Sequence, residues 1–231
     1  MANKRGAFIV IEGLDRSGKS TQSSAIFARL REHNIPSRLI KFPDRTTPIG
    51  KIIDAYLKSQ SNLDDRAIHL LFSANRWELA TSIQQILTSS AADTVPTLIL
   101  ADRYAFSGIA FSHAKGLPYT WCRAPDVSLP APDLTVFLDI SPEYARERGG
   151  YGEERYEKEE MQKKVREVFL RMANEMTGDV EDRRVRDRRW ITIDASRSIE
   201  HVTDDIWNAI LPLIHGTAEP LSRLWEDQGD F

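Results

Sequence analysis

Short apolar runs alternate with longer segments of helical spacing along the chain. The runs are rich in β-branched and aromatic residues, as is typical of strands buried on both faces. They lie at residues 7–11 (AFIVI), 39–42 (LIKF), 97–100 (TLIL), 134–140 (LTVFLDI) and 190–193 (WITI). Helical spacing occurs at residues 19–33, 48–57, 63–88, 142–148, 154–176 and 198–214. Strands separated by helices predict right-handed βαβ units and a parallel sheet covered on both faces.

Capping residues support the predicted helix starts. Ser141 stands before Pro142, and Asp64 and Asp65 open the third helix. No internal repeat or low-complexity linker divides the 231 residues, so we expect one α/β domain over residues 1–231.

The nearly balanced charge narrows the class of partners. The chain has 31 Lys and Arg residues against 34 Asp and Glu residues, a net charge of -3, so a general attraction for nucleic acid is not expected. An anionic ligand must therefore be held by a local site. The segment 178–189 (GDVEDRRVRDRR) carries both signs, and we interpret it as a solvated turn or helix end; residues 226–231 are expected to fray.

Cysteine usage and hydropathy indicate an intracellular protein. Cys122 is the only cysteine, which excludes an intramolecular disulfide and fits a reducing compartment. A single cysteine is more often a packed residue than a nucleophile. The first strand follows the N-terminus too closely for a signal peptide, and no window approaches the roughly 18 consecutive apolar residues of a membrane span.

The strongest motif is GLDRSGKS at residues 13–20, between the first strand and the first helix. It matches G-x-x-x-x-G-K-[ST], a loop whose backbone N–H groups cradle nucleotide phosphates. Gly13 and Gly18 let the backbone fold around an anion, Lys19 would reach the β- and γ-phosphates, and the Ser20 hydroxyl would bind Mg²⁺. The motif predicts a nucleoside triphosphate site without naming a second substrate.

The same loop carries Asp15 and Arg16, two charges that phosphate binding does not require. Phosphoryl transfer depends mostly on positioning and charge stabilisation, so an arginine here would act as a finger supplied in cis. An acid that points away from the phosphates can recognise sugar hydroxyls.

Asp102 follows the third apolar run, where a second metal ligand is expected. Taken alone, it fits a cap of the next turn equally well. Arg103 and Ser107 follow it at the carboxyl end of a predicted strand, where open α/β sheets bind their ligands, and Arg103 is better explained as an anion clamp than as a surface charge.

Phe72 and Arg76 lie one turn apart on one face of the long third helix. Together they could stack on and hydrogen-bond a flat heterocycle, although an aromatic residue on a helix is more often plain core. Arg45, in a proline-rich loop after the second run, could meet a phosphate or only solvent.

These pieces together resemble the thymidylate kinase family, in its eukaryotic type. The matching segments span nearly the whole chain in order, and DRYAFSG and FSANRWE are far more specific than the phosphate loop. They are GLDRSGKSTQS, KFPDRTTPIGK, HLLFSANRWE, DRYAFSGIAFSHAKG, WCRAPDVSLPAPDLTVFLD, RGGYGEERYE, DASRSIE and PLSRLWE. The charged segment 178–189 departs from the family in looking longer than expected.

The resemblance implies a P-loop NTPase fold of the nucleoside monophosphate kinase kind, with a five-stranded parallel sheet. It also implies the reaction ATP + dTMP = ADP + dTDP in dTTP synthesis, Mg²⁺ as cofactor, a homodimer, and a cytoplasmic or nuclear location. No nucleic acid or membrane partner is expected. A lid segment would lie at about residues 146–157 and a dTMP-binding region at about residues 41–80.

For dTMP, the resemblance implies that thymine stacks on Phe72 and that Arg76 bonds its O4. Arg45 and Arg103 would grip the monophosphate, and Phe111 would crowd a ribose 2′-hydroxyl and so favour deoxynucleotides. The remaining dTMP positions are Asp15 on the sugar 3′-hydroxyl, Phe42, Ser107, Tyr156 and Gln162.

For ATP and catalysis, the resemblance implies that Arg16 reaches the transferred phosphoryl group and that Asp102 lies close to the metal. The catalytic set is then Arg16, Lys19, Asp102 and Arg103, and the metal ligands are Ser20 and Asp102. The ATP site comprises Gly13, Arg16, Ser17, Gly18, Lys19, Ser20, Thr21, Arg148 and Ser196. Arg148 and Arg155 match lid positions from which one arginine would reach ATP.

Three other classes stay open at the level of sequence. The first is a P-loop kinase acting on UMP, CMP or a deoxynucleoside, which the side chains at Phe72, Arg76 and Phe111 disfavour. The second is a GTPase-like switch, which needs a guanine-binding Asn-Lys-x-Asp loop that the sequence lacks. The third is a catalytically inactive interaction module, which Lys19 and Asp102 argue against.

Overall fold

A five-stranded parallel sheet forms the centre of the molecule, with strand order β2-β3-β1-β4-β5. The computed structural model describes residues 4–89, 95–148, 154–177 and 189–226. The strands are β1 (Phe8–Gly13), β2 (Ser37–Lys41), β3 (Leu98–Asp102), β4 (Leu134–Asp139) and β5 (Trp190–Asp194). The expectation of a parallel sheet in which each apolar run is a strand is confirmed.

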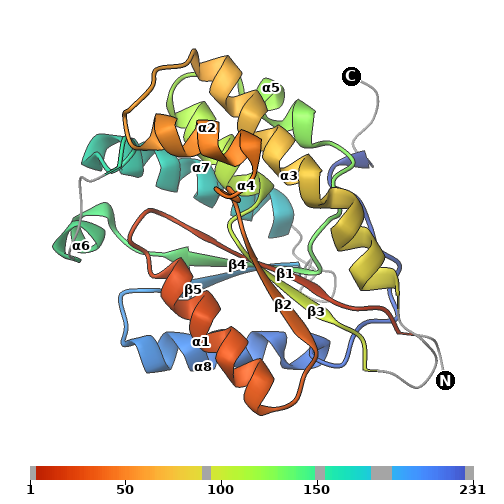
Figure 1. The fold of residues 1–231 in the computed structure, drawn as a ribbon. Coiled ribbons are helices and arrows are strands. Elements are labelled where there is room, and N and C mark those ends of the chain that lie inside the picture. The colour runs from red at the N-terminus through yellow and green to blue at the C-terminus, as the bar shows by residue number, and fades with distance from the viewer. Residues whose placement is uncertain (1–3, 90–94, 149–153, 178–188, 227–231) are drawn as a thin grey trace.

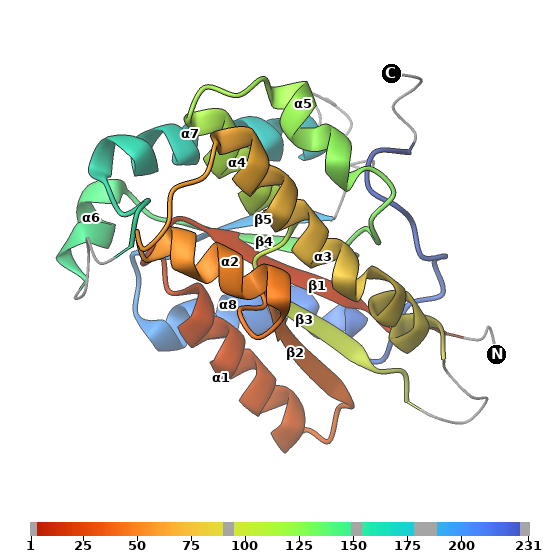
Figure 2. The same ribbon diagram turned by 45° about the horizontal axis from the view of Figure 1, so that its top comes forward.

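Helices cover both faces of the sheet. They are α1 (Lys19–Glu32), α2 (Pro48–Leu57), α3 (Asp65–Thr88), α4 (Ala105–Ala114), α5 (Tyr119–Arg123), α6 (Pro142–Glu147), α7 (Glu159–Thr177) and α8 (Ile199–Ile210), with 3₁₀ turns at Ala124–Asp126 and Leu211–Leu213. Helices α1 and α8 lie together on one face, and α3, α4 and α7 lie on the other (Figure 1). Figure 2 shows α2 lying beside α3 above the carboxyl ends of β1 and β3.

Two helices were missing from the sequence prediction. The segment that forms α4, AFSGIAFSHA, is buried from Ala105 to Ser112, so it shows no polar face and no helical period. Helix α5 has only five residues, too few to establish a period.

Helix α7 begins at Glu159, five residues later than the spacing predicts. The backbone N–H of Arg155 donates to the carbonyl of Leu57 at 3.1 Å, which ties the preceding segment to the end of α2 instead of to a helical turn. The predicted caps are present: Ser141 Oγ accepts from the N–H of Tyr144, and Asp64 accepts from the N–H of Arg66.

The core is built around β1, β3 and β4, whose apolar residues are almost all fully buried. Cys122 is a buried free thiol, and burial raises its pKa to about 11, which fits the packed role that its isolation in the sequence suggests. Across the described ranges, no helix combines the length and apolar character needed to cross a membrane. The charged segment is outside the described residues apart from Arg189, and so are residues 227–231 of the tail.

Candidate active site

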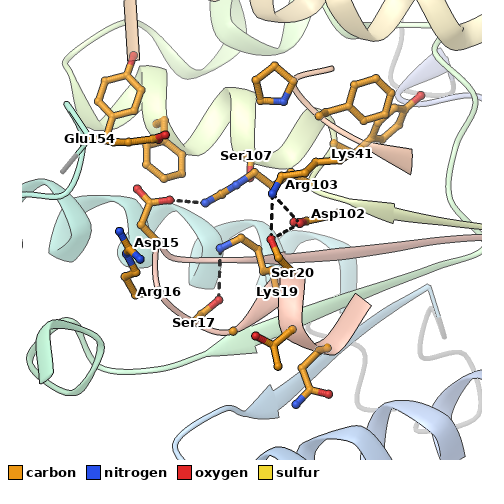
Figure 3. Close-up of a pocket in the computed structure, with 18 of the residues that line it drawn as sticks. Asp15, Arg16, Ser17, Lys19, Ser20, Lys41, Asp102, Arg103, Ser107 and Glu154 are labelled. Atoms are coloured by element: carbon orange, nitrogen blue, oxygen red, sulfur yellow. Dashed lines mark hydrogen bonds and ion pairs between the residues drawn. The ribbon is translucent and has the colours of Figure 1, made fainter. Parts of the chain in front are cut away.

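A cavity of about 830 Å³ opens at the carboxyl ends of the central strands. The loop between β1 and α1 forms its floor, and α3, α4 and the segment 154–157 form its walls. Open α/β sheets bind ligands at this edge. Figure 3 shows the charged side chains of the loop and of the end of β3 directed toward one another.

The loop between β1 and α1 has the conformation of an anion cradle. Gly18 adopts the left-handed region at φ 94° and is the N-cap of α1, without a side chain to accept from the first N–H groups. Those N–H groups carry the positive end of the helix dipole, so they are available to an anion. Arg16 has φ 62°, an unusual conformation for a residue with a Cβ atom, at the turn of the loop.

Lys19 begins α1 and is 5% exposed. Its ammonium donates to the carbonyl of Leu14 and lies 3.4 Å from Ser17 Oγ (Figure 3). Burial, together with the positive charge of Arg103, lowers the pKa of Lys19 to about 7, although nearby carboxylates act to raise it. Its preference for the charged form therefore depends on an anion bound in the loop.

Ser20 and Asp102 meet as the sequence predicts. The Ser20 hydroxyl donates to Asp102 Oδ2 at 2.6 Å, and Lys41 Nζ lies 3.0 Å from Ser20 Oγ and 3.4 Å from Asp102 Oδ2 (Figure 3). Burial alone would raise the pKa of Asp102, but Lys19, the Ser20 hydrogen bond and other nearby cations hold it below its usual value.

This pair of oxygen ligands fits a hard divalent cation. Asp102 Oδ1 is buried without a hydrogen-bond partner in the structure, so it has capacity left for a ligand. Hydroxyl and carboxylate oxygens are the donors that Mg²⁺ prefers, and Mg²⁺ usually keeps several waters. Among the described residues there is no cluster of three or more His, Cys, Asp or Glu side chains that could hold a metal ion. Water and substrate oxygens would therefore complete the coordination.

Two arginines predicted to bind phosphate are paired with carboxylates of the segment 154–157. Arg16 Nε donates to Glu157 Oε1 at 2.8 Å. Arg45 donates to Glu154 Oε1 and to Asp54 Oδ1, both at 2.8 Å. The donors of both guanidinium groups that were expected to meet a phosphate are thus engaged by carboxylates.

Arg103 is fixed by a network that begins in β1. It pairs with Asp15 and donates to Ser107 Oγ at 3.0 Å (Figure 3). Ser107 in turn donates to the fully buried carboxylate of Glu12, which also accepts the N–H groups of Tyr104 at 2.9 Å and Ser107 at 3.0 Å. Burial raises the pKa of Glu12, while these hydrogen bonds favour its charged form. Glu12 therefore caps α4 and orients Arg103 through Ser107.

The cavity lining also includes a buried guanidinium, that of Arg76. Arg76 is 2% exposed and donates from Nε and Nη2 to Asp126, at 3.1 and 2.6 Å. Ser73 donates to the same carboxylate at 2.7 Å. A Cβ atom at Gly108 would lie 2.8 Å from Arg76 Nη2, so the absence of a side chain there makes room for the guanidinium. Asp126 engages one edge of Arg76, which leaves Nη1 for a ligand.

Aromatic rings also line the cavity. The rings of Phe111 and Tyr156 lie 5.4 Å apart, and the guanidinium of Arg103 lies 5.3 Å from the Phe111 ring centre. Phe72 is half-buried one turn before Arg76 and faces the same cavity.

Most of the predicted residues line this one cavity: Asp15, Arg16, Ser17, Gly18, Lys19, Ser20, Thr21, Phe42, Arg45, Phe72, Arg76, Asp102, Arg103, Ser107, Phe111, Arg148 and Tyr156. Gly13, Gln162 and Ser196 are outside the lining. The carbonyl of Gly13 accepts a hydrogen bond from Arg103. The side-chain amide of Gln162 donates to Asp15 Oδ2 at 2.9 Å, and the hydroxyl of Ser196 donates to Asp194 at 2.6 Å.

The two arginines of the predicted lid have different partners. Arg148 donates to the carbonyls of Arg16 at 3.1 Å and Ala195 at 2.6 Å, so it joins the phosphate loop to the loop after β5. Arg155 donates to the carbonyls of Tyr56 and Ser61 instead, outside the cavity. Within the lid segment, residues 149–153 lie outside the described residues.

Sequence reasoning missed several residues of the site. Lys41 is the last residue of β2 and directly precedes Phe42, which the resemblance assigned to the dTMP site, so its position in the sequence could have identified it. Glu157 and Asp126 become recognisable only through Arg16 and Arg76, which lie 141 and 50 positions away in the chain.

Comparison with known proteins gives one consistent result. A family model described as thymidylate kinase matches residues 11–206. The thymidylate kinase of Schizosaccharomyces pombe is 50% identical over 94% of this chain and 98% of its own length. The thymidylate kinase of Homo sapiens is 40% identical over 98% of this chain and its own full length. A solved structure of the thymidylate kinase of Candida albicans is similar with a TM-score of 0.77 and 38% identity, covering 95% of this chain and 98% of the other.

Proposed function

The chain belongs to the thymidylate kinase family, and from this premise we propose how its cavity carries out the transfer of a phosphoryl group from ATP to dTMP. It is a nucleoside monophosphate kinase whose products are ADP and dTDP. The observation that carries the assignment of sites is that the phosphate loop, Arg103 and the buried guanidinium of Arg76 all line one cavity.

We place the ATP phosphates on the loop between β1 and α1. The N–H groups at the start of α1 and the ammonium of Lys19 hold them, and Arg148 closes the donor side by linking Arg16 to Ala195. Ala195, Arg197 and Ile199 line the cavity beyond this point, where the adenosine would lie.

We place dTMP across the other half of the cavity. Its base stacks on Phe72 and its O4 accepts from Arg76, while Arg45 and Arg103 bind its phosphate. Asp15 lies beside Arg103 and Gln162, where it can accept from the sugar 3′-hydroxyl. Phe42, Ser107, Phe111 and Tyr156 enclose the nucleotide.

Transfer then requires little covalent work from the protein. An oxygen of the dTMP phosphate attacks the γ-phosphorus of ATP in line, the new P–O bond forms, and the bond to the β–γ bridging oxygen breaks as ADP leaves. Arg16 leaves Glu157 and neutralises the charge that spreads over the transferred group. Arg103 holds the attacking phosphate, and the aromatic walls exclude water.

We propose Ser20 and Asp102 as the residues that hold Mg²⁺, directly or through water. When bound, the ion supplies charge neutralisation at the β- and γ-phosphate oxygens. Lys41 Nζ lies against both side chains and would lie beside an ion held there.

The test of this function is ADP release by the purified chain with ATP and one acceptor at a time. We expect release with dTMP and Mg²⁺, weak release with UMP, CMP or thymidine, and none after chelation with EDTA. Release driven by UMP as efficiently as by dTMP would contradict the placement of Phe111. Full activity in EDTA would contradict the metal assignment.

Replacing Phe72 by alanine tests the stacking position. Loss of one base–aromatic contact is expected to weaken dTMP binding by about 1–3 kcal/mol. The KM of dTMP should rise while the KM of ATP stays unchanged, because Phe72 lies on α3, one turn before Arg76, and not on the phosphate loop. Phe72→Tyr is the matched control, since it keeps the ring; an unchanged KM of dTMP in Phe72→Ala would contradict the assignment.

Binding of ATP is expected to take up a proton at pH 8. The pKa of Lys19 in the free protein is about 7, so at pH 8 the side chain is mostly neutral, and an adjacent triphosphate raises that pKa. Titration calorimetry in buffers of different ionisation enthalpy should show uptake of close to one proton at pH 8 and almost none at pH 6. Lys19→Arg is the control, because arginine is always charged; equal uptake in that variant would contradict the role of Lys19.

We also propose that the chain forms a homodimer through α3. Leu70 and Trp77 are two turns apart on α3, and their side chains are 48% and 41% exposed. Exposure of two large apolar side chains on one helix is unfavourable in water, and a second copy of the chain would cover them. Light scattering would check the mass.

The expected cytoplasmic or nuclear location stays a prediction, which cell fractionation would check.

A further inference from the structure

We propose that His69 is a positioning residue that determines base specificity by forcing the hydroxyl of Ser112 to act as a hydrogen-bond acceptor in the cavity. The proposal rests on the proposed function for the orientation of the nucleotide, with the base at the Arg76 end. The proposal adds Ser112 as a second polar contact to the base, and it explains why Ser112 can only accept a hydrogen bond there.

His69 lies behind the cavity wall and is 0% exposed. Its Nε2 is 2.9 Å from the carbonyl oxygen of Cys122, and its Nδ1 is 2.8 Å from Ser112 Oγ. It is absent from the cavity lining, whereas Ser112 belongs to it. His69 therefore acts on a ligand only through Ser112.

The carbonyl of Cys122 decides the tautomer of His69. A carbonyl oxygen can only accept, so the proton of the neutral imidazole is on Nε2, and Nδ1 is an acceptor. Burial, followed by the charge of Arg76, lowers the pKa of His69, so the ring is neutral at physiological pH. The Ser112 hydroxyl must then donate its proton to Nδ1, and only the lone pairs of its oxygen are left for a ligand.

Ser112 lies next to the arginine that reads the base. It is on α4 one turn after Gly108, the position against which the guanidinium of Arg76 is packed. Arg76 can only donate, and Asp126 fixes its orientation. The base end of the cavity thus presents a donor beside an acceptor.

This pattern is complementary to one edge of a pyrimidine and not to another. Thymine and uracil present O4, an acceptor, beside N3–H, a donor. Cytosine presents an amino group beside an unprotonated N3, so both contacts would bring like groups together. A buried polar group that is left unpaired costs more free energy than a hydrogen bond contributes. The donor of Arg76 and the acceptor of Ser112 therefore disfavour cytosine by more than they favour thymine or uracil.

The test compares dUMP with dCMP, which differ only at this edge of the base. Titration calorimetry gives the ratio of the two Kd values without turnover, and ADP release gives the ratio of the two kcat/KM values. In His69→Phe the hydroxyl of Ser112 is free to rotate and can donate to cytosine N3. We expect the preference for dUMP over dCMP to fall by about tenfold in both ratios.

A double-variant cycle separates this role from a structural one. Ser112→Ala should lower the preference by about as much as His69→Phe, and adding His69→Phe to Ser112→Ala should change it no further. Ser112→Thr keeps the hydroxyl and should retain the preference. If His69→Phe does not fold, Ser112→Ala and Ser112→Thr carry the test alone.

An unchanged preference in His69→Phe or Ser112→Ala overturns the proposal, and so does a further loss in the double variant. These outcomes leave the proposed function standing as long as the wild-type chain phosphorylates dTMP. Conversely, a wild-type chain that binds dUMP over dCMP in a His69-dependent way but releases no ADP would support the base reading and contradict the kinase mechanism.

Discussion

Replacement of Arg16 by alanine is expected to lower kcat by about 10³-fold or more while the Kd of dTMP stays near the wild-type value. The guanidinium belongs to the phosphate loop, beside the position that we propose for the transferred group, and it forms an ion pair with Glu157. An interaction made mainly in the transition state affects kcat more than substrate binding. Steady-state ADP release with dTMP and calorimetric binding of dTMP measure the two quantities.

Arg16→Lys is the matched control for this experiment. A lysine keeps the charge but not the planar pair of donors, so it should recover only part of the loss. Turnover of Arg16→Ala within tenfold of the wild type would show that another cation neutralises the transferred group. Arg148 would be the first candidate, because it already contacts the carbonyl of Arg16.

In the proposed mechanism, Glu157 holds the Arg16 guanidinium before a substrate binds. Glu157 is only 6% exposed at its side chain and holds Arg16 Nε at 2.8 Å. Glu154 holds Arg45 in the same way from the same short segment. In the proposed mechanism both arginines exchange a carboxylate for a phosphate on substrate binding, so neither guanidinium is left without an anionic partner.

The sequence predicted the parts of the site that depend on local order. The phosphate loop, Ser20 and the acid after β3 have fixed spacing from a strand or a helix, and the parallel sheet brings Ser20 and Asp102 to 2.6 Å. The alternative that Asp102 merely caps a turn was reasonable from the sequence alone. Its contacts with Ser20 and Lys41 place it at the phosphate loop instead.

What the sequence could not predict depends on distant partners or on complete burial. Helix α4 carries Ser107, Phe111 and Ser112, yet its burial on all sides removes the periodic signal that identifies a helix. The roles of Glu12 and Asp126 depend on groups about 50 to 95 positions away, so neither residue has a local motif.

Replacement of Asp126 by alanine is expected to have the second large effect, a loss of about 3–5 kcal/mol in the free energy of unfolding. The Arg76–Asp126 pair is almost completely enclosed, with side chains 3% and 0% exposed, so removing the carboxylate leaves a buried charge without its partner. Urea denaturation measures the loss. Ser73→Ala removes a single donor to the same carboxylate and should cost only about 1 kcal/mol.

A double variant shows whether the pair exists for stability or for ligand binding. Asp126→Leu with Arg76→Met replaces both charges by apolar groups of similar length and should recover most of the stability, as apolar replacements of buried ion pairs often do. It should not recover dTMP affinity, because the donor to O4 is gone. A stable double variant that binds dTMP weakly would place the pair in substrate recognition, and a double variant that binds normally would remove Arg76 from it. The stability lost when one partner is removed therefore does not show whether the Arg76–Asp126 pair serves folding or substrate recognition. The double variant separates the two, because it restores stability without restoring the donor to the base.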